Sequence, residues 1–534
     1  MPPPNALALL LASLLTAAAD EAPLRIGFGS DGLASIAWRG HELLADGRIG
    51  ATWNDAIVTR GDDGTASTTA MADGRLTVEP DAGRVRRDFA WGWLGCDYRV
   101  EGERLALDVT IVNTGSTAIL ATHLQLLELA LPGAMREYDG VTPRMSLNRD
   151  EPTIVVATFP GGRLALCNDD IDRALALGFP VANDRPGHTR FPIYADTGRR
   201  DWLPDSLGAI DRPIHPGCAD RYLVSLRFGD EDARTDRLAG DVAERFRAAH
   251  PPTLAWPDRR PIGSLHLSST VPHPPANPRG WLGNDPGIDT TTDAGRADFA
   301  ARLTAHVDGA IAELARVGAQ GVVLWDVEGQ EHPHATSYIG DPRQLPPEMD
   351  AIADGLFARL TAAGLRTGVC IRPQLPVRGA YCGDVHQAEV PTHEMARVLN
   401  EKIAYARARW GCTLFYVDSN VAGAGWRVAD PAIFRAVAAA HPDVLLIPEH
   451  ETCAYWATTA PYHELRQGWT GTPASVRAIY PEAFSVVYVA DGDAAGRRAE
   501  LAAAVRGGDV LLFRCWWPDP FNDDVIAIMA EAHR

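Results

Sequence analysis

The chain has 534 residues, of which 46% are hydrophobic and 22% are charged, and its formal net charge at pH 7 is −19. This length predicts two or three domains rather than one core. The acidic excess argues against nucleic acid and anionic membrane surfaces as partners, because binding phosphate groups needs a basic face. An uncharged partner such as a carbohydrate is compatible with the charge.

The N-terminal residues have the pattern of an export signal. An apolar run covers residues 6–16, and the alanines at 17–19 offer a small-residue cleavage site before Asp20. The run is too short to span a membrane. We therefore expect residues 1–19 to be a signal peptide and the mature protein to be periplasmic or extracellular. The eight cysteines include no C-x-x-C motif and leave disulfide pairing open.

Short alternating strands are expected over residues 20–229. Within residues 104–113 every second side chain is Leu, Val or Ile. Residues 75–79 and 221–228 show a similar alternation of apolar and polar side chains. Turn-forming clusters of Gly, Asp and Asn separate these runs. Short strands of this kind at close spacing predict an antiparallel β-sandwich domain.

Residues 230–257 are expected to form a helical linker. Leu238, Val242 and Phe246 recur at four-residue spacing, which is typical of one buried helix face. The helix should end at the Pro-Pro pair at 251–252, because proline cannot continue it.

From residue 258 to 534 the pattern changes to strands that alternate with helices. Apolar runs are centred near residues 264, 322, 368, 414, 445, 470, 486 and 511. Eight strands with intervening helices predict a (β/α)8 barrel, whose active site forms at the C-terminal ends of the strands. An open doubly wound sheet is disfavoured, because no G-x-G-x-x-G motif opens a helix.

The residues that directly follow these runs are therefore the candidates for the site. Carboxylates follow four of the eight predicted strands, and aromatic rings accompany them. Carboxylates combined with flat apolar rings suit sugars, which offer hydroxyls and C–H faces. The predicted substrate-binding residues are Asp326, Glu328, Arg372, Tyr416, Asn420, Glu451, Trp456, Asp491 and Trp516. For Tyr416 a place in the barrel-lining core is an equally good interpretation.

Asp418 is the predicted reactive centre. It follows a buried apolar run, and Glu449 follows the next strand in the chain. Neighbouring strands lie about 5 Å apart, so the two carboxyl groups could have the short separation of a retaining glycosidase. In that interpretation Asp418 is the nucleophile and Glu449 is the acid/base with a raised pKa.

The barrel sequence also resembles a known group of enzymes. Residues 340–349, a helix and then residues 363–368 resemble the second-helix region of α-galactosidase-like and α-glucosidase-like barrels. The motif Tyr416-Val-Asp418-Ser-Asn420 is similar to their fourth-strand motif, whose Asp is the nucleophile. The resemblance implies a retaining glycosidase with a β-sandwich before the barrel.

Two features depart from that group. Tyr416 stands where those families keep a Lys, and residues 468–472, at the predicted sixth strand, offer no acid. A Glu after the fifth strand, as Glu449 here, is instead similar to α-amylase-like and endo-α-N-acetylgalactosaminidase-like enzymes. The resemblance therefore leaves the acid/base open among Glu449, Glu451 and Asp491.

The sequence thus predicts an exported retaining glycoside hydrolase that acts on a glycan or glycoside, with an α-linkage favoured, and uses no metal or cofactor. One alternative is a non-catalytic carbohydrate-binding barrel. Another is a metal-dependent hydrolase built on Asp326, Glu328, His332 and His334, although no H-E-x-x-H motif occurs. The sugar, its linkage, exo or endo action and the oligomeric state are left open.

Overall fold

The structure of the protein is a computed structural model that describes residues 22–44, 56–62, 65–133, 137–139, 154–173, 175–178, 182–185, 188–197, 212–269, 273–330, 339–378, 385–422, 427–516 and 519–534. The predicted signal peptide, His332 and His334 lie outside these residues. The described residues form two compact units that divide after Val242.

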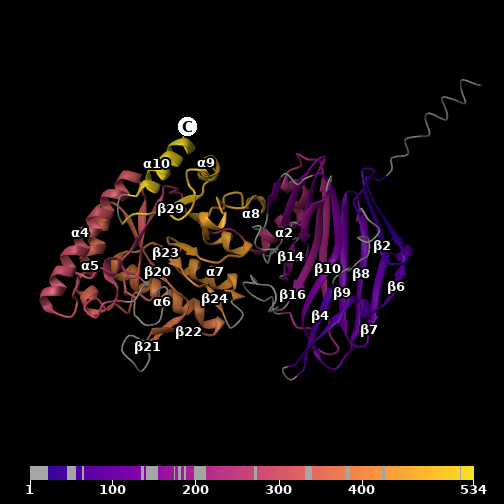
Figure 1. Ribbon diagram of the computed structural model, residues 1–534, viewed down its shortest axis with the longest axis horizontal. Coiled ribbons are helices and arrows are strands. Elements are labelled where there is room, and N and C mark those ends of the chain that lie inside the picture. The colour runs from indigo at the N-terminus through magenta and orange to yellow at the C-terminus, as the bar shows by residue number, and fades with distance from the viewer. Residues whose placement is uncertain are drawn as a thin grey trace, which may run out of the picture. The chain divides into compact units, whose positions relative to one another are not determined.

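The first unit consists of antiparallel sheets (Figure 1). The larger sheet has the order β11 (Glu137–Asp139), β12 (Ile154–Phe159), β13 (Gly162–Asn168), β17 (Ala219–Gly229), β9 (Arg104–Asn113), β8 (Gly92–Glu101), β7 (Arg84–Phe89) and β6 (Arg75–Glu79). The second has the order β14 (Ala176–Gly178), β16 (His188–Thr197), β10 (Ala118–Pro132), β4 (Ala56–Asp62) and β5 (Thr65–Ala70), with β15 (Ala182–Arg185) also paired to β16. A third joins β1 (Leu24–Gly29), β2 (Gly32–Trp38) and β3 (His41–Glu42).

Strand β9 shows why these sheets form a sandwich. Its buried and partly exposed residues alternate strictly, and Leu107 and Val109 point into the core. The same core contains Leu124 and Leu126 of β10, which belongs to the other large sheet. Two sheets that share one apolar layer form a β-sandwich, which confirms the fold predicted for this part of the chain.

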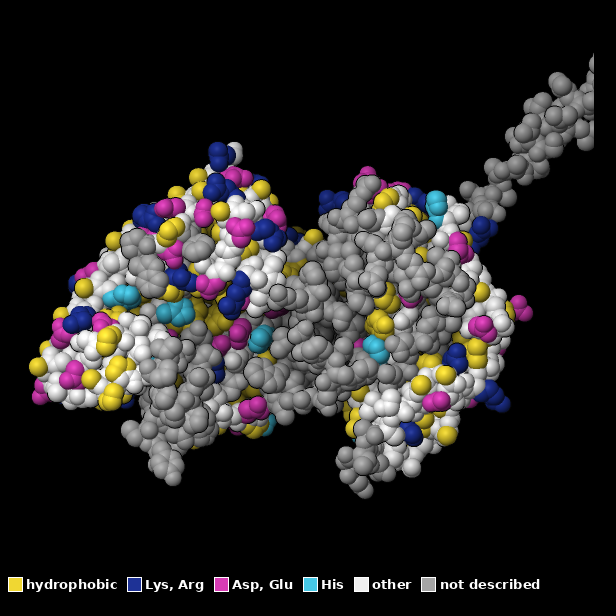
Figure 2. Space-filling model, in the orientation of Figure 1, with side chains coloured by type: hydrophobic (Ala, Val, Ile, Leu, Met, Phe, Trp, Pro, Cys, Tyr) yellow, Lys and Arg dark blue, Asp and Glu magenta, His cyan; other side chains and the backbone are white. Residues whose placement is uncertain are grey.

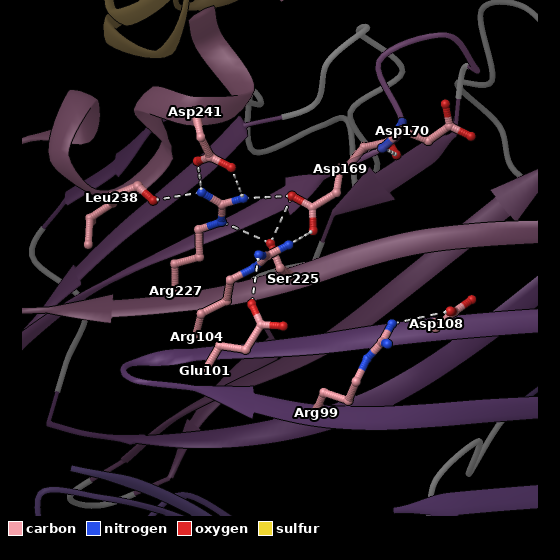
Figure 3. Close-up of polar contacts among 11 residues, drawn as sticks. Arg99, Glu101, Arg104, Asp108, Asp169, Asp170, Ser225, Arg227, Leu238 and Asp241 are labelled. Atoms are coloured by element: carbon pink, nitrogen blue, oxygen red, sulfur yellow. Dashed lines mark hydrogen bonds and ion pairs between the residues drawn. The ribbon is translucent and has the colours of Figure 1, made fainter. Parts of the chain in front are cut away.

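Helix α2 (Thr235–Ala249) follows the last sandwich strand and is held to it by Arg227 (Figure 3). The guanidinium of Arg227 donates to the carbonyl of Leu238 at 3.0 Å and to Oδ1 of Asp169 at 2.7 Å, and it also bonds Asp241. Ala239, the residue after Leu238, has non-helical backbone angles. The arginine thus binds α2 where the helix is kinked.

The second unit contains eight parallel strands. They are β18 (Ile262–His266), β19 (Gly321–Trp325), β20 (Arg366–Ile371), β23 (Leu414–Val417), β26 (Leu445–Pro448), β27 (Tyr462–Glu464), β28 (Val486–Tyr488) and β29 (Val510–Arg514). Their order in the sheet is β26-β23-β20-β19-β18-β29-β28-β27. The two end strands come together because Ala460, just before β27, donates a backbone hydrogen bond to Leu446 of β26 at 3.0 Å. The second unit is therefore a (β/α)8 barrel, as predicted.

Helices lie along the outside of the strands (Figure 1). They are α3 (Trp281–Asn284), α4 (Asp293–Val317), α5 (Pro347–Ala362), α6 (Thr392–Trp410), α7 (Pro431–Ala440), α8 (Ala474–Ile479), α9 (Arg498–Arg506) and α10 (Pro520–Ala532). Short 3-10 turns occur at Met71–Asp73, Pro80–Ala82, Cys453–Ala457 and Leu465–Gln467, and small hairpins at Leu375–Arg378 with Val385–Ala388 and Val421–Ala422 with Arg427–Val428. None of the described helices is long and apolar enough to cross a membrane.

The predicted position of the sixth strand is wrong. The strand was expected near residue 470, but it is β27, three residues long and ending at Glu464. Thr472 instead lies in a loop, where its backbone nitrogen and hydroxyl donate to Asp509 at 3.0 and 2.6 Å. The sequence was misleading because the true strand is short and partly polar. As a consequence, a carboxylate does end the sixth strand.

The barrel has an apolar layer outside its strands and another inside them. The outer layer packs strands against helices and includes Phe299 of α4 and Leu324 of β19. The inner layer includes Trp325, Cys370 and Tyr416. On the face drawn in Figure 2, the acidic and basic side chains of the barrel unit are interspersed, so this surface is covered by charges of both signs.

Candidate active site

Asp418 lies directly after β23 and is almost completely buried, with 4% of its surface exposed. Its Oδ2 accepts hydrogen bonds from Nε and Nη2 of Arg372, which follows β20. The two residues come from adjacent strands, so the sheet itself brings them together. Both of these nitrogen donors of Arg372 bind the same oxygen of Asp418. This edge of the guanidinium therefore orients Asp418 and is not available to a ligand.

Asp418 is also hydrogen-bonded to Glu449. Burial and the neighbouring charge of Glu449 outweigh the effect of Arg372 and raise the pKa of Asp418 to about 7. The raised pKa that the sequence predicted for Glu449 stays a prediction. Oε2 of Glu449 accepts the backbone N–H of Ser419 at 2.7 Å, and Ser419 has a left-handed backbone with φ 47°.

The predicted catalytic pair is thus adjacent. Asp418 and Glu449 follow the paired strands β23 and β26, and Glu449 acts on the pKa of Asp418. Retaining glycosidases place their two carboxyl groups about 5–5.5 Å apart, so the position of this pair is compatible with the predicted roles.

Asp326 and Glu328 form a second buried acidic group, directly after β19. Each has 2% of its surface exposed. Asp326 has a left-handed backbone with φ 62°, which is uncommon for a residue with a side chain, and it accepts a hydrogen bond from Gln330. Burial and then the charge of Glu328 raise the pKa of Asp326 well above its usual range. Burial also raises the pKa of Glu328 to about 7.

Lys402 of α6 is a fully buried site residue that the sequence analysis missed. Its ammonium donates to the backbone carbonyls of Gly340, Arg372 and Gln374 at 2.8 to 2.9 Å and lies 3.8 Å from Oδ2 of Asp341. Burial lowers its pKa to about 8. Lys402 therefore fixes the loops after β19 and β20. A signal was present, because Lys402 interrupts the apolar face of a helix.

Asn420 joins the ends of two strands. Its Nδ2 donates to the carbonyl of His450 at 2.8 Å, and its Oδ1 accepts the N–H of His450 at 2.8 Å. The side chain is fully buried. Since both ends of the carboxamide bind the backbone, Asn420 holds the loop after β26 against the loop after β23. A substrate contact of Asn420 stays a prediction.

A row of aromatic rings crosses the barrel interior below these carboxylates. Tyr416 lies between Trp325 and Tyr462, at 5.1 Å from each ring centre, and Tyr462 lies 6.0 Å from Tyr488. Tyr416 has 5% of its surface exposed and belongs to the inner apolar layer. The structure therefore places Tyr416 in the barrel lining, which was the alternative interpretation of this residue.

Two other predicted binding residues lie around the sixth strand. Trp456 is buried, donates from Nε1 to Ser485 Oγ at 3.2 Å, and packs edge-on against His463 of β27. Oε1 of Glu451 lies 3.7 Å from Nε2 of the same histidine. The structure thus gathers Trp456 and Glu451 around His463.

Asp491 and Trp516 lie around Arg514 at the end of β29. Asp491 is ion-paired with Arg514, and the guanidinium lies 4.8 Å from the centre of the Trp516 ring. Arg514 also lies 3.6 Å from Asp519. These contacts form a polar and aromatic group at the mouth, after the seventh and eighth strands.

Glu464 is a further carboxylate at the mouth. It was not predicted as a site residue because the sixth strand was predicted too late in the chain. Its Oε1 accepts the hydroxyl of Tyr462 at 2.9 Å, and its Oε2 accepts Nε of Arg466 at 2.8 Å and Nε2 of Gln467 at 2.9 Å. Both oxygens of Glu464 are therefore engaged by side chains that follow or belong to the sixth strand.

A metal centre finds no support in the described part of the chain. No group of three or more His, Cys, Asp and Glu side chains there is arranged to hold a metal ion. Asp326 and Glu328 are described, but the two histidines that the metal hypothesis needs, His332 and His334, lie outside the described residues.

No protein-family model matches the sequence. A search of curated proteins also finds no match.

Among solved structures, the chain is similar to a GH31 family sulfoquinovosidase from E. rectale, with a TM-score of 0.45, 10% identity, and coverage of 96% of this chain and 82% of that one. It is also similar to the GH36 alpha-galactosidase AgaA from Geobacillus stearothermophilus (TM-score 0.38, 11% identity, 90% and 73% covered). A third similar structure is the alpha-galactosidase from Lactobacillus brevis (TM-score 0.37, 11% identity, 96% and 73% covered). These proteins are glycosidases, the class that the sequence resemblance implies, but similarity at this level assigns no residue and no activity.

Proposed function

We propose that the barrel unit is a retaining glycoside hydrolase with Asp418 as nucleophile and Glu449 as acid/base. The observation that supports this most directly is the carboxyl pair at the ends of two adjacent strands, in which Asp418 is buried against Arg372 and Glu449 is partly exposed. Glycosidic cleavage by retention needs two carboxyl groups of different roles on either side of the reacting bond. The preference for an α-linked substrate rests on the sequence resemblance.

The geometry suggests how the two carboxyl groups divide their work. With the pKa of Asp418 raised to about 7 by burial and by Glu449, the pair holds a proton near neutral pH. A substrate that enters between the groups would leave Arg372 on Asp418 and so favour its ionised form. The proton would then remain with Glu449.

In the first step, an oxygen of Asp418 attacks the anomeric carbon while the bond to the leaving oxygen breaks and Glu449 gives that oxygen its proton. In the second step, Glu449 takes a proton from water, whose oxygen attacks the anomeric carbon and releases Asp418. The two steps return both carboxyl groups to their starting protonation states.

The decisive experiment is the substitution Asp418→Asn, assayed on a panel of 4-nitrophenyl α-glycosides. We expect kcat/KM on any substrate that the unmodified protein cleaves to fall by at least about 10⁴-fold. NMR of the first product formed should show the same anomeric configuration as the substrate. Full activity of the Asn variant, or an inverted product, would refute the proposal.

The role of Glu449 is tested separately by Glu449→Gln. An acid catalyst matters most when the leaving group is poor, so activity should fall more on an alkyl glycoside than on a 4-nitrophenyl glycoside. Glu464→Gln is the matched control at the end of the next strand. If Glu464→Gln shows this dependence on the leaving group and Glu449→Gln does not, the acid/base is Glu464.

We also propose that the protein is exported. N-terminal sequencing of the mature protein from a fractionated host should find that it begins near Asp20 and is located outside the cytoplasm. A cytoplasmic protein that keeps its first residues would contradict export without affecting the enzymatic proposal.

A further inference from the structure

The positively charged side chains described around Asp418 are all engaged by the protein itself. Arg372 is bound to Asp418, and Lys402 is held by three backbone carbonyls and lies near Asp341. Arg514, at the far side of the mouth, is paired with Asp491. None of these cations is left over to balance an acidic group on a ligand.

The acidic side chains, in contrast, are in excess. Asp326 and Glu328 are both 2% exposed, and in the described part of the chain neither has an ion pair with Lys or Arg. The charges of Glu328 and Asp418 act on Asp326, and Glu328 has only the more distant charge of Lys402 to offset Asp341. A buried carboxylate without a bound cation is costly, so acidic groups outnumber the positive charges in this part of the site.

Two buried oxygen acceptors at the mouth also lack donors. Oε1 of Glu328 and Oε1 of Gln374 are inaccessible to solvent and have no hydrogen-bond partner in the structure. Buried polar atoms of this kind usually have a partner. Gln374 uses its other end, Nε2, to hold the carbonyls of Ser419 and Val421 at 2.9 and 3.2 Å. Acceptors thus outnumber donors in this part of the barrel, and both unpartnered oxygens add negative potential to it.

In sequence, the stretches of the barrel that lie outside the described residues contain neither Lys nor Arg. They are residues 270–272, 331–338, 379–384, 423–426 and 517–518, and their ionisable side chains include Glu331, His332, His334 and Asp384.

We propose that this site selects its sugar by charge: it rejects a ring with an acidic substituent, accepts an uncharged ring, and binds an amine-bearing ring most tightly. The inference rests on the proposed function, because it assumes that the sugar binds beside Asp418. The selection follows from Coulomb's law. An anionic substituent would be repelled by three or more buried carboxyl groups, whereas a cationic substituent would be attracted to them.

The test is calorimetric binding at pH 7.5 with sugars that differ only at C6. The gluco series consists of D-glucose, 6-amino-6-deoxy-D-glucose and D-glucuronic acid, and the galacto series has the same three substituents. In the series that fits the site, we expect the uronic acid to bind at least about 30-fold more weakly than the amino sugar, with the parent sugar between them. A uronic acid that binds as tightly as its parent, or no binding in either series, would overturn the inference.

Two variants test whether the carboxyl groups cause the selection. Glu328→Gln removes one negative charge from the site. It should bring the dissociation constants of the amino sugar and the uronic acid closer together, so that their ratio falls. The matched control, Asp308→Asn, removes the same charge from an exposed ion pair with Arg359 on α4 and α5 and should leave the ratio unchanged. Equal ratios in both variants would overturn the electrostatic cause.

The same samples separate this inference from the proposed activity. Turnover of the 4-nitrophenyl α-glycosides of each series reports hydrolysis, whereas calorimetry reports binding alone. If the order of affinities holds but nothing is hydrolysed, charge selection stands and the glycosidase proposal fails. If glycosides are hydrolysed without any order by charge, the glycosidase proposal stands and charge selection fails.

Discussion

Each unit of the molecule contains a buried arginine–aspartate pair, and the two pairs have opposite surroundings. In the sandwich unit, Arg227 and Asp169 have side chains 7% and 8% exposed, and in the barrel unit Arg372 and Asp418 have side chains 8% and 5% exposed. Burial is therefore the same in both. What differs is the balance of donors and acids around each pair.

Around Asp169 there are enough hydrogen-bond donors to bind both carboxylate oxygens. Its Oδ1 accepts Arg227 and the hydroxyl of Ser225, and its Oδ2 accepts Arg104 at 2.9 Å (Figure 3). Burial alone would lower the pKa of Arg227, but its hydrogen bond to Asp241 and the neighbouring acids raise that pKa instead. A pair whose two members are hydrogen-bonded by the surrounding protein has a structural role, here the attachment of α2 to the sheet.

Around Asp418 the acids outnumber the donors. Glu449 is its acidic neighbour, and the charge of Asp418 in turn acts on Asp326 in the same site. The carboxyl group consequently titrates near neutral pH, whereas an ordinary aspartate titrates near 4. The same two residue types thus fix structure in one unit and provide an adjustable proton in the other. Groups of the second kind are typical of functional sites.

The largest effect that would sharpen this contrast is expected for Arg372→Met. Without the guanidinium the pKa of Asp418 should rise further above 7, so more of the nucleophile is protonated and inactive. We expect kcat/KM at pH 7 to fall by about 10³-fold and the acidic limb of its pH profile to move to higher pH. An unchanged pH profile would show that Arg372 does not control Asp418.

The corresponding change in the sandwich unit is Arg227→Met, and its effect should be on stability. It leaves Asp169 buried with fewer donors, which typically costs about 3–5 kcal/mol in the free energy of unfolding. Urea denaturation measures this loss, and activity per folded molecule should stay the same. A loss of activity in the remaining folded protein would contradict the division of roles between the two pairs.

A smaller effect is expected for Glu328→Gln, and it depends on pH. The folded protein keeps the Glu328 proton up to about pH 7, whereas the unfolded chain releases it near pH 4. Between these values the folded state binds more protons, so its stability falls as pH rises. Glu328→Gln should remove this slope and stabilise the protein by about 3–4 kcal/mol above pH 7.

Denaturation curves of Glu328→Gln and the unmodified protein between pH 4 and 9 provide the measurement. The two curves should converge near pH 4, where Glu328 is protonated in both folded and unfolded chains. A variant that is less stable above pH 7 would show that the carboxylate of Glu328 has a cationic partner after all.

The smallest effect is expected for Arg84→Ala, on the outer face of the sandwich. Arg84 pairs with Asp97 at 2.6 Å, but both side chains are well exposed, at 47% and 38%. Water can replace either partner of an exposed pair, so the denaturation midpoint should not change measurably. A clear decrease would mean that burial is not what distinguishes the Arg227 pair from surface pairs.

Much of the architecture could be predicted from local patterns. The alternation in residues 104–113 predicts a strand with one buried face, and β9 has that pattern. The apolar runs before Asp326, Asp418 and Glu449 are themselves strands of the barrel, and each strand ends just before its carboxylate. Because the C-terminal ends of parallel strands meet at one mouth, the order of the strands was enough to predict that these carboxylates lie together.

The errors came where the local pattern was weak. Strand β27 is three residues long and includes His463 and Glu464, so it was placed too late in the chain, and Glu464 was overlooked. Lys402 was overlooked because its partners are backbone carbonyls, which no residue pattern identifies. Tyr416 was assigned to both the site and the core, since a strand residue before the mouth can belong to either.

The sequence by itself therefore determined seven of the eight barrel strands and most of the acids at the mouth, because these depend on residue patterns within about ten positions. Only the tertiary structure placed the sixth strand with Glu464 and brought Asp418 against Arg372. Arg372 and Asp418 are 46 positions apart in the chain. Their contact, their burial and the charge of Glu449 arise only when the strands are adjacent and water is excluded, and those conditions set the electrostatics of the site.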